Sequence, residues 1–75
     1  MTVEEAFGVV LKKLREERQL SQMEIVRRTG LDRTTVPKYE KGKRSPNLKS
    51  ILLIANALGI SASDLMKQVE QVIEE

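Results

Sequence analysis

Residues Ser21–Lys41, SQMEIVRRTGLDRTTVPKYEK, contain two short amphipathic helical patterns separated by a break around Gly30. Ser21 followed by Glu24 is the pattern of a capping box, which predicts that the first helix of the stretch begins at Gln22. Gly30 is predicted to end that helix, because only glycine cheaply adopts the left-handed conformation found just after a helix C-terminus. We therefore expect a sharp turn between two helices here, and this turn decides the fold.

The second helix of the stretch is predicted to have one apolar face and one basic face. Asp32 is expected to cap its N-terminus, and Val36 and Tyr39, three residues apart, are expected to face the core. The opposite face carries Arg33, Thr34, Pro37, Lys38 and Lys41. Side chains at this spacing point together and fit the major groove of DNA, which is about 12 Å wide. The two helices are thus typical of a helix-turn-helix.

The composition indicates one small globular domain, residues 1–75, and excludes several classes of function. The chain has 75 residues, of which 40% are hydrophobic and 32% charged, which is enough apolar content for a helical core. It contains no cysteine and no histidine, so disulfides, ordinary zinc ligation and histidine acid/base catalysis are ruled out. We predict that the chain is not an enzyme and that it uses no metal or other cofactor.

Membrane and export signals are not found in the sequence. No apolar run approaches the roughly 18 residues that a membrane span requires. The segment Met1–Ala6 lacks the basic and apolar blocks of a signal peptide. We therefore expect no membrane partner and a cytoplasmic location.

Positive charge is concentrated in one part of the chain. The formal net charge of the whole is only +2, but residues 27–44 contain seven Lys and Arg against two Asp and Glu, a local net charge of +5. Residues 45–75 carry a net charge of −2. A local basic patch indicates a polyanionic partner, and the predicted helix-turn-helix makes double-stranded DNA the expected one.

Three more helices are predicted, over about residues 3–18, 48–58 and 62–75. Each follows a residue that commonly caps helices, namely Thr2, Asn47 or Ser61. The helix over 48–58 is apolar on most sides, and we expect it to be the central buried helix. Because no segment shows the alternation typical of strands, the predicted fold class is a compact all-α domain of five helices.

The last predicted helix carries an apolar stripe that extends beyond what a small core needs. Its members are Leu65, Val69, Val72 and Ile73. Two interpretations are open: the helix folds over the first helix, or it forms a dimer interface, because exposed apolar stripes usually mark association sites. We place the core at about residues 5–66 and treat residues 62–75 as a candidate dimerising helix.

These features resemble the Cro and phage-repressor type of helix-turn-helix, also called the XRE-like family. The resemblance lies in Leu20-Ser21-Gln22, Thr29-Gly30-Leu31, Tyr39–Pro46 and Ile54–Gly59, within a match over about residues 5–66. It implies a lambda-repressor-like fold in which helices 2 and 3 form the helix-turn-helix. In this family the second of these helices, the recognition helix, enters the major groove.

The resemblance also implies a set of DNA contacts. The residues expected to reach base edges are Arg33, Thr34 and Lys38. Arg33 ranks first, because arginine to guanine is the commonest specific contact. The residues expected to hold phosphates are Gln22, Thr35, Lys41, Lys43 and Arg44. Gln22 is further expected to brace the start of helix 3, and Thr35 is a candidate for either kind of contact.

Arg15 and Glu40 match positions that this family pairs in a salt bridge between helices 1 and 3. Such a pair would fix the recognition helix against the rest of the domain. Three residues depart from the family's pattern. Gln19 replaces a common glycine and predicts a left-handed residue. Val26 is larger than the usual alanine and predicts a slight spreading of helices 2 and 3. Pro37 predicts a loosened or kinked first turn of helix 3.

The leading functional prediction is a sequence-specific, homodimeric transcription regulator. Its two recognition helices would enter successive major grooves about 34 Å apart on a pseudo-palindromic operator. A phage-type repressor and a controller protein of a restriction-modification system both fit, and the sequence does not choose between them. The alternative is an antitoxin or a protein-binding adaptor that grips a partner through the last helix. Steep loss of affinity with salt would favour the DNA-binding regulator.

Overall fold

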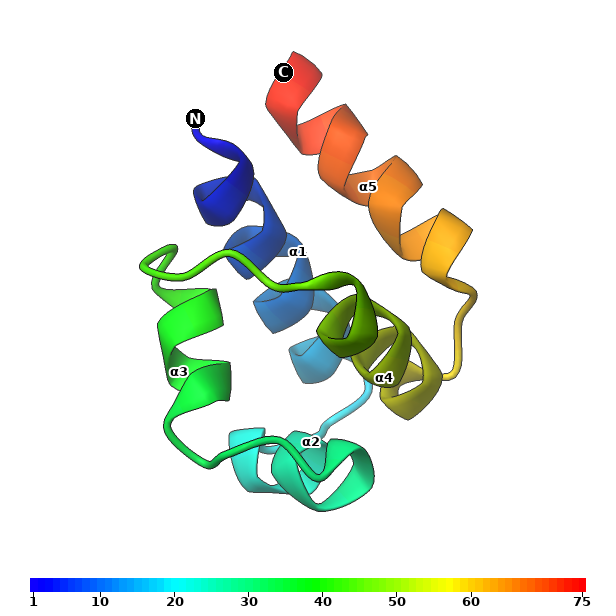
Figure 1. Cartoon of the computed structure of the whole chain (residues 1–75). Coiled ribbons are helices and arrows are strands. Elements are labelled where there is room, and N and C mark those ends of the chain that lie inside the picture. Colours follow the sequence, from blue (N-terminus) through cyan, green and yellow to red (C-terminus); the bar gives the residue numbers. More distant parts are fainter.

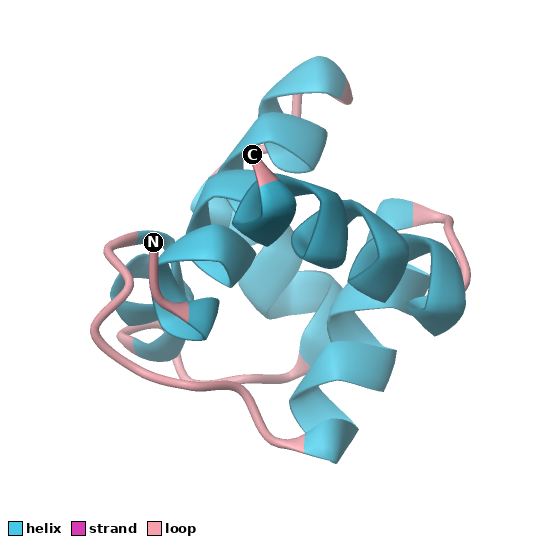
Figure 2. Ribbon diagram, turned by 90° about the horizontal axis from the view of Figure 1, so that it is seen from above, coloured by secondary structure: helices cyan, strands magenta, loops and turns pink.

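Five helices joined by short turns and loops make up the chain, and the computed structural model describes all residues from 1 to 75 (Figure 1). Their bounds are α1 Val3–Glu17, α2 Gln22–Thr29, α3 Thr35–Glu40, α4 Leu48–Leu58 and α5 Ala62–Glu74. Helices are the only regular elements, and loops join them without any strand (Figure 2). The predicted all-α, five-helix fold is confirmed.

The predicted caps account for most of the helix boundaries. Thr2 and Glu5 form a complete capping box, with the Glu5 backbone N–H donating to Thr2 Oγ1 at 3.1 Å and the Thr2 N–H donating to Glu5 Oε1 at 2.8 Å. At α2 only half of the box forms: Ser21 Oγ accepts from the Glu24 N–H at 3.1 Å. The Glu24 carboxylate pairs with Arg27 instead.

Left-handed residues follow α1 and α2, as the sequence predicts. Gly30 follows α2 with φ of 74°, and its N–H donates to the Val26 carbonyl. Gln19, after α1, has φ of 56° and is the only residue other than glycine with a positive φ. The expected left-handed strain at Gln19 is therefore present, and it costs on the order of 1 kcal/mol.

The core is built mainly on α1, which corrects the prediction that the helix over 48–58 is the central buried one. Five apolar side chains of α1 are buried: Ala6, Phe7, Val10, Leu11 and Leu14. On α4, by contrast, Leu48 and Leu52 are 72% and 53% exposed. The apolar residues of α4 surround the helix, but only one side of it packs against other helices.

The last helix lies along α1, and the two chain ends meet at the same end of the molecule (Figure 1). Leu65 and Val69 are fully buried in the core, so the prediction that they form a dimer interface is wrong. They complete the hydrophobic cover of α1. Val72 is half-buried and Ile73 is 40% exposed, so only these two members of the predicted stripe are available to a partner.

No single helix combines the length and the apolar character that crossing a bilayer demands, and only α4 with α5, bent by 102° at their junction, do so as a pair.

Candidate nucleic-acid interface

The turn before α3 is closed by Asp32, in a way that differs from the predicted cap. Asp32 Oδ1 accepts from the Thr34 N–H at 2.8 Å and from the Thr34 hydroxyl at 2.6 Å. The helix itself begins at Thr35, with Thr34 at the N-cap position. The two hydrogen bonds, first from the Thr34 side chain and then from its backbone, lower the pKa of Asp32. The carboxylate thus sets the turn that presents Arg33 and Thr34 to solvent.

The later start of α3 removes the conflict predicted at Pro37. Counted from Thr35, this proline is the third residue of the helix, where the backbone N–H has no partner within the helix. Proline therefore sacrifices no helical hydrogen bond at this position, and its fixed φ suits the first turn. The predicted loosening of α3 was wrong because it assumed a helix that starts two residues earlier.

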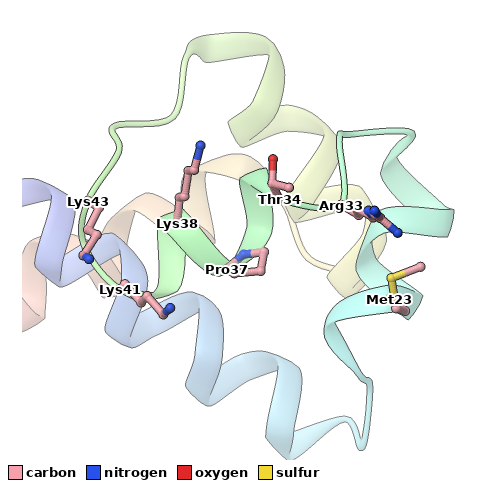
Figure 3. Close-up of a pocket in the computed structure, with 7 residues that line it drawn as sticks. All are labelled: Met23, Arg33, Thr34, Pro37, Lys38, Lys41 and Lys43. Carbon is pink, nitrogen blue, oxygen red and sulfur yellow. The ribbon is translucent and has the colours of Figure 1, made fainter.

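Basic side chains surround an open hollow between α3 and the start of α2 (Figure 3). The hollow has a volume of about 490 Å³, and it is lined by Met23, Arg33, Thr34, Pro37, Lys38, Lys41 and Lys43. Four of these residues are cations and none is an acid. A concave surface lined by charges of one sign focuses its electrostatic field and attracts ions of opposite charge. We call this surface the basic hollow.

The structure brings most of the predicted contact residues to this one surface. All three predicted base-reading residues line the hollow, and so do Lys41 and Lys43. Arg44 is exposed in the following loop, just outside it. Thr35 is the exception, because it is only 7% exposed and packs into the protein. A buried Thr35 is not available for the predicted contact with DNA.

Two of the seven basic residues in the 27–44 segment serve other purposes. Arg27 pairs with Glu24 on the exposed side of α2. The Arg28 side chain reaches α4, where its Nη1 donates to the Ala57 carbonyl at 3.0 Å. The charge count of the sequence therefore overstates the cations at the interface, and the geometry selects which of them are available.

A buried ionic cluster fixes the end of the recognition helix, as predicted. Arg15 Nε donates to Glu40 Oε2 at 2.7 Å and Arg15 Nη2 to Glu40 Oε1 at 3.0 Å, while the two side chains are only 12% and 5% exposed. Glu40, as the main hydrogen-bonding partner, raises the pKa of Arg15. Bidentate pairing of this kind sets orientation as well as distance, so α3 is held in one position against α1.

Gln22 joins the same cluster, and this changes the role predicted for it. Its Nε2 donates to Glu40 Oε1 at 3.0 Å, so it braces the C-terminal end of α3 rather than the start. The amide nitrogen has a second hydrogen that is free to donate. A phosphate contact by Gln22 therefore stays compatible with its structural role.

Tyr39 and Gly8 also hold α3 in place, and the role of Gly8 was not predicted. The Tyr39 hydroxyl donates to Ser50 Oγ at 3.1 Å, and its ring packs edge-on against Phe7 with centroids 5.8 Å apart. Gly8 on α1 lets the end of α3 approach closely: a Cβ there would clash with the Tyr39 carbonyl oxygen and lie 2.8 Å from that of Glu40. A glycine inside a helical pattern is the signal that could have revealed this approach.

Met23 is a residue of the interface that was not predicted from the sequence. It lies on α2, yet it lines the basic hollow next to Arg33 (Figure 3). Nothing in the sequence separates it from any other exposed apolar residue. Its place at the interface follows only from the angle at which α2 and α3 meet.

This fold, with an outward-facing basic hollow on its second and third helices, defines a helix-turn-helix domain. The model of the helix-turn-helix family matches residues 11–65, well over half of the chain. The chain belongs to this family, of the Cro and phage-repressor type that the sequence resembled.

The chain is similar to a controller protein and to a phage repressor. The chain is 41% identical over 66 residues to the control protein C.MunI of Mycoplasma sp, a match that covers 87% of this chain and 89% of that protein. It is 33% identical over 69 residues to the cryptic phage CTXphi transcriptional repressor RstR of Vibrio cholerae, covering 92% of this chain but only 62% of the repressor. The chain thus spans nearly the length of a controller protein and under two thirds of the phage repressor.

Solved structures of controller proteins share the whole fold. The restriction-modification controller C.Esp1396I, solved as a tetramer in complex with its natural 35 base-pair operator, superposes with a TM-score of 0.89 at 25% identity, covering 100% of this chain and 99% of that one. The controller C.AhdI from Aeromonas hydrophila superposes with a TM-score of 0.79 at 39% identity, covering 83% of this chain and 94% of that one.

Proposed function

We propose that this chain is a homodimeric, sequence-specific regulator of transcription that binds double-stranded DNA through the basic hollow. The observation that carries the proposal is the hollow itself, with four cations and no acid on the exposed side of a helix-turn-helix. The operator complex of C.Esp1396I and the names of the repressor and controller relatives support it. The identity to the control protein C.MunI, 41% against 33% for the phage repressor, favours the controller type.

Each side chain at the interface has a proposed role. Arg33, Thr34 and Lys38 read base edges, because they lie at the exposed start and outer face of α3. Lys41, Lys43 and Arg44 hold phosphates from the end of α3 and the loop after it. Gln22 adds a neutral phosphate contact from the start of α2. Because the proposed role is to bind DNA, we assign no catalytic activity and place the regulator in the cytoplasm, where its operator would lie.

The dimer requires a surface other than the buried part of α5. Apolar side chains remain exposed at two places, Val72 and Ile73 at the end of α5 and Leu48 and Leu52 on α4. We propose that one of these surfaces pairs two copies of the chain. A symmetric pairing presents two identical hollows, which matches an operator with two-fold symmetry.

Selection of bound sequences from a random pool of duplex DNA at about 0.15 M salt tests the proposal. We expect a consensus with two-fold symmetry and half-sites near one helical turn apart. Three phosphate-binding cations per protomer predict that log K falls with log salt with a slope of about −5 for the dimer. No enriched sequence, or a slope near zero, would overturn the regulator and favour the antitoxin or adaptor.

Two variants separate base reading from phosphate binding. Arg33→Ala should cost about 1–3 kcal/mol on the selected operator and relax the preference at one base pair. Lys43→Ala should weaken all DNA alike and reduce the salt slope by about one for each protomer. Lys67→Ala, an exposed lysine on α5 away from the hollow, is the control and should change neither. Equal, sequence-independent losses for the first two variants would refute base reading by Arg33.

A further inference from the structure

The basic hollow contains an apolar spot that the DNA contacts above leave unused. Met23 is 48% exposed, and Pro37 lines the same hollow from the neighbouring helix. In Figure 3, Arg33 and Met23 lie at one end of the hollow, Lys41 and Lys43 lie at the other end, and Pro37 stands between them. Met23 is therefore next to the proposed guanine-reading arginine, and Pro37 lies between Met23 and the phosphate-binding lysines.

Met23 lies outside the packed core of the domain. It belongs neither to the hydrophobic core nor to the partly buried side chains packed against the core. Its neighbours along the chain have structural bonds, since Gln22 holds Glu40 and Glu24 pairs with Arg27. An apolar thioether exposed to water is unfavourable, and a ligand that occupies the basic hollow would cover it.

The chemistry of the lining limits which base edges fit there. The hollow offers N–H donors from one arginine and three lysines, and its one side-chain acceptor is the Thr34 hydroxyl, which already donates to Asp32. Adenine and cytosine present amino donors in the major groove, which call for an acceptor on the protein. Guanine presents two acceptors, and thymine presents one acceptor beside a methyl group. Of the two, only thymine offers an apolar group to match Met23 and Pro37.

We propose that Met23 and Pro37 form a contact for the 5-methyl group of a pyrimidine, a thymine adjacent to the base read by Arg33. This inference rests on the proposed DNA-binding function and adds a specificity element to it. Burial of one methyl group is worth about a fourfold change in affinity. A dimer that reads one thymine in each half-site therefore gains about 15-fold over the same operator without the two methyl groups.

Deoxyuridine substitution tests the contact, because it removes the methyl group and leaves base pairing unchanged. In the selected operator, each thymine is replaced by deoxyuridine at symmetric positions, and Kd is measured by fluorescence anisotropy. We expect one position per half-site at which the substitution weakens binding by about 15-fold in total. For Met23→Ala the ratio of the two Kd values at that position should fall from about 15 to about 4, because half of the contact with each methyl group is lost. Met23→Leu should keep most of the ratio.

Two controls make the readings decisive. Val9→Ala shortens an exposed apolar side chain outside the hollow and should leave the thymine preference intact. Pro37→Ala tests the second half of the spot, and circular dichroism checks that each variant keeps its helix content. A duplex with 5-methylcytosine in place of cytosine tests the other natural source of a pyrimidine methyl group.

Each outcome has a definite meaning. Selective binding with no thymine sensitive to deoxyuridine overturns the thymine contact and leaves the proposed regulator standing. Sensitivity that survives both Met23→Ala and Pro37→Ala overturns the assignment to these side chains. A gain only with 5-methylcytosine refutes thymine as the source of the methyl group. Failure to select any sequence refutes the proposed function and this inference with it.

Discussion

Removal of the Glu40 charge is the sharpest test of how the recognition helix is held. Glu40→Gln keeps the volume of the side chain but leaves the Arg15 guanidinium without its counter-charge. Arg15 is 12% exposed and retains one hydrogen bond, from Nη1 to the Leu20 carbonyl at 2.9 Å. Breaking a buried ion pair by removing one partner costs about 3–5 kcal/mol. Because Arg15 keeps that bond and some contact with water, we expect the lower end, about 3 kcal/mol.

This loss is large for so small a domain. A chain of this length has on the order of 4–11 kcal/mol of stability in all. A loss of 1 kcal/mol lowers Tm by about 4–8 °C in a domain of this size, so Glu40→Gln should lower Tm by about 12–24 °C. Thermal unfolding followed by circular dichroism at 222 nm measures it. DNA binding at low temperature should weaken as well, because α3 loses its fixed position.

The control is the exposed ion pair on α2. Glu24 and Arg27 are 40% and 62% exposed, so Glu24→Gln should cost less than about 1 kcal/mol. A double-mutant cycle with Arg15→Met isolates the pair itself. The double variant should lose at least about 1 kcal/mol less than the sum of the two single losses. If Glu40→Gln shifts Tm no more than Glu24→Gln does, the ionic cluster around Glu40 does not hold α3 in place.

Three further predictions concern the scaffold, the turn and the dimer. Gly8→Ala should destabilise the domain by about 1–3 kcal/mol, because the added Cβ meets the end of α3. At an unobstructed position inside a helix, the same substitution stabilises by up to about 1 kcal/mol. A rise in Tm would therefore contradict the close approach. Since the pKa of Asp32 is lowered in the folded state, the ionised carboxylate contributes its full stability above about pH 4 and loses it as the pH falls through the lowered pKa. Asp32→Asn should abolish this acid-dependent part of the stability. An acid profile in chemical unfolding that the substitution leaves unchanged would count against the turn. Ile73→Asp and Leu52→Asp place a charge on the two candidate dimer surfaces without entering the core, and sedimentation velocity should show a monomer for one of them; two intact dimers would move the interface elsewhere.

Local sequence signals predicted the helices well because capping is a short-range property. Thr2, Ser21, Asn47 and Ser61 each accept a hydrogen bond from a backbone N–H three residues later, as the sequence pattern requires. Asp32 is the instructive failure. It bonds to Thr34 only two residues on, which closes a turn and delays the start of α3. Both arrangements satisfy the same side chain, and the sequence alone does not distinguish them.

The burial of apolar side chains on the outer helices was predicted least well from local sequence patterns. Leu65 and Val69 looked available for a dimer, whereas Leu48 and Leu52 looked buried, and the structure reverses both. A helical pattern shows which residues share a face. It does not show how much of that face its neighbours cover, because coverage depends on the packing of helices that are distant in sequence.

Short motifs and a family pattern were enough to predict the five helices, the helix-turn-helix, the family and the ionic pair Arg15–Glu40. The packing of the helices decides which charges and apolar groups line the basic hollow. Arg28 turns to α4, while Met23 joins the basic hollow from α2. The physical reason is that an interface is assembled from two helices, and their mutual position is set by Gly8, Tyr39 and the buried cluster around Glu40 rather than by any local pattern.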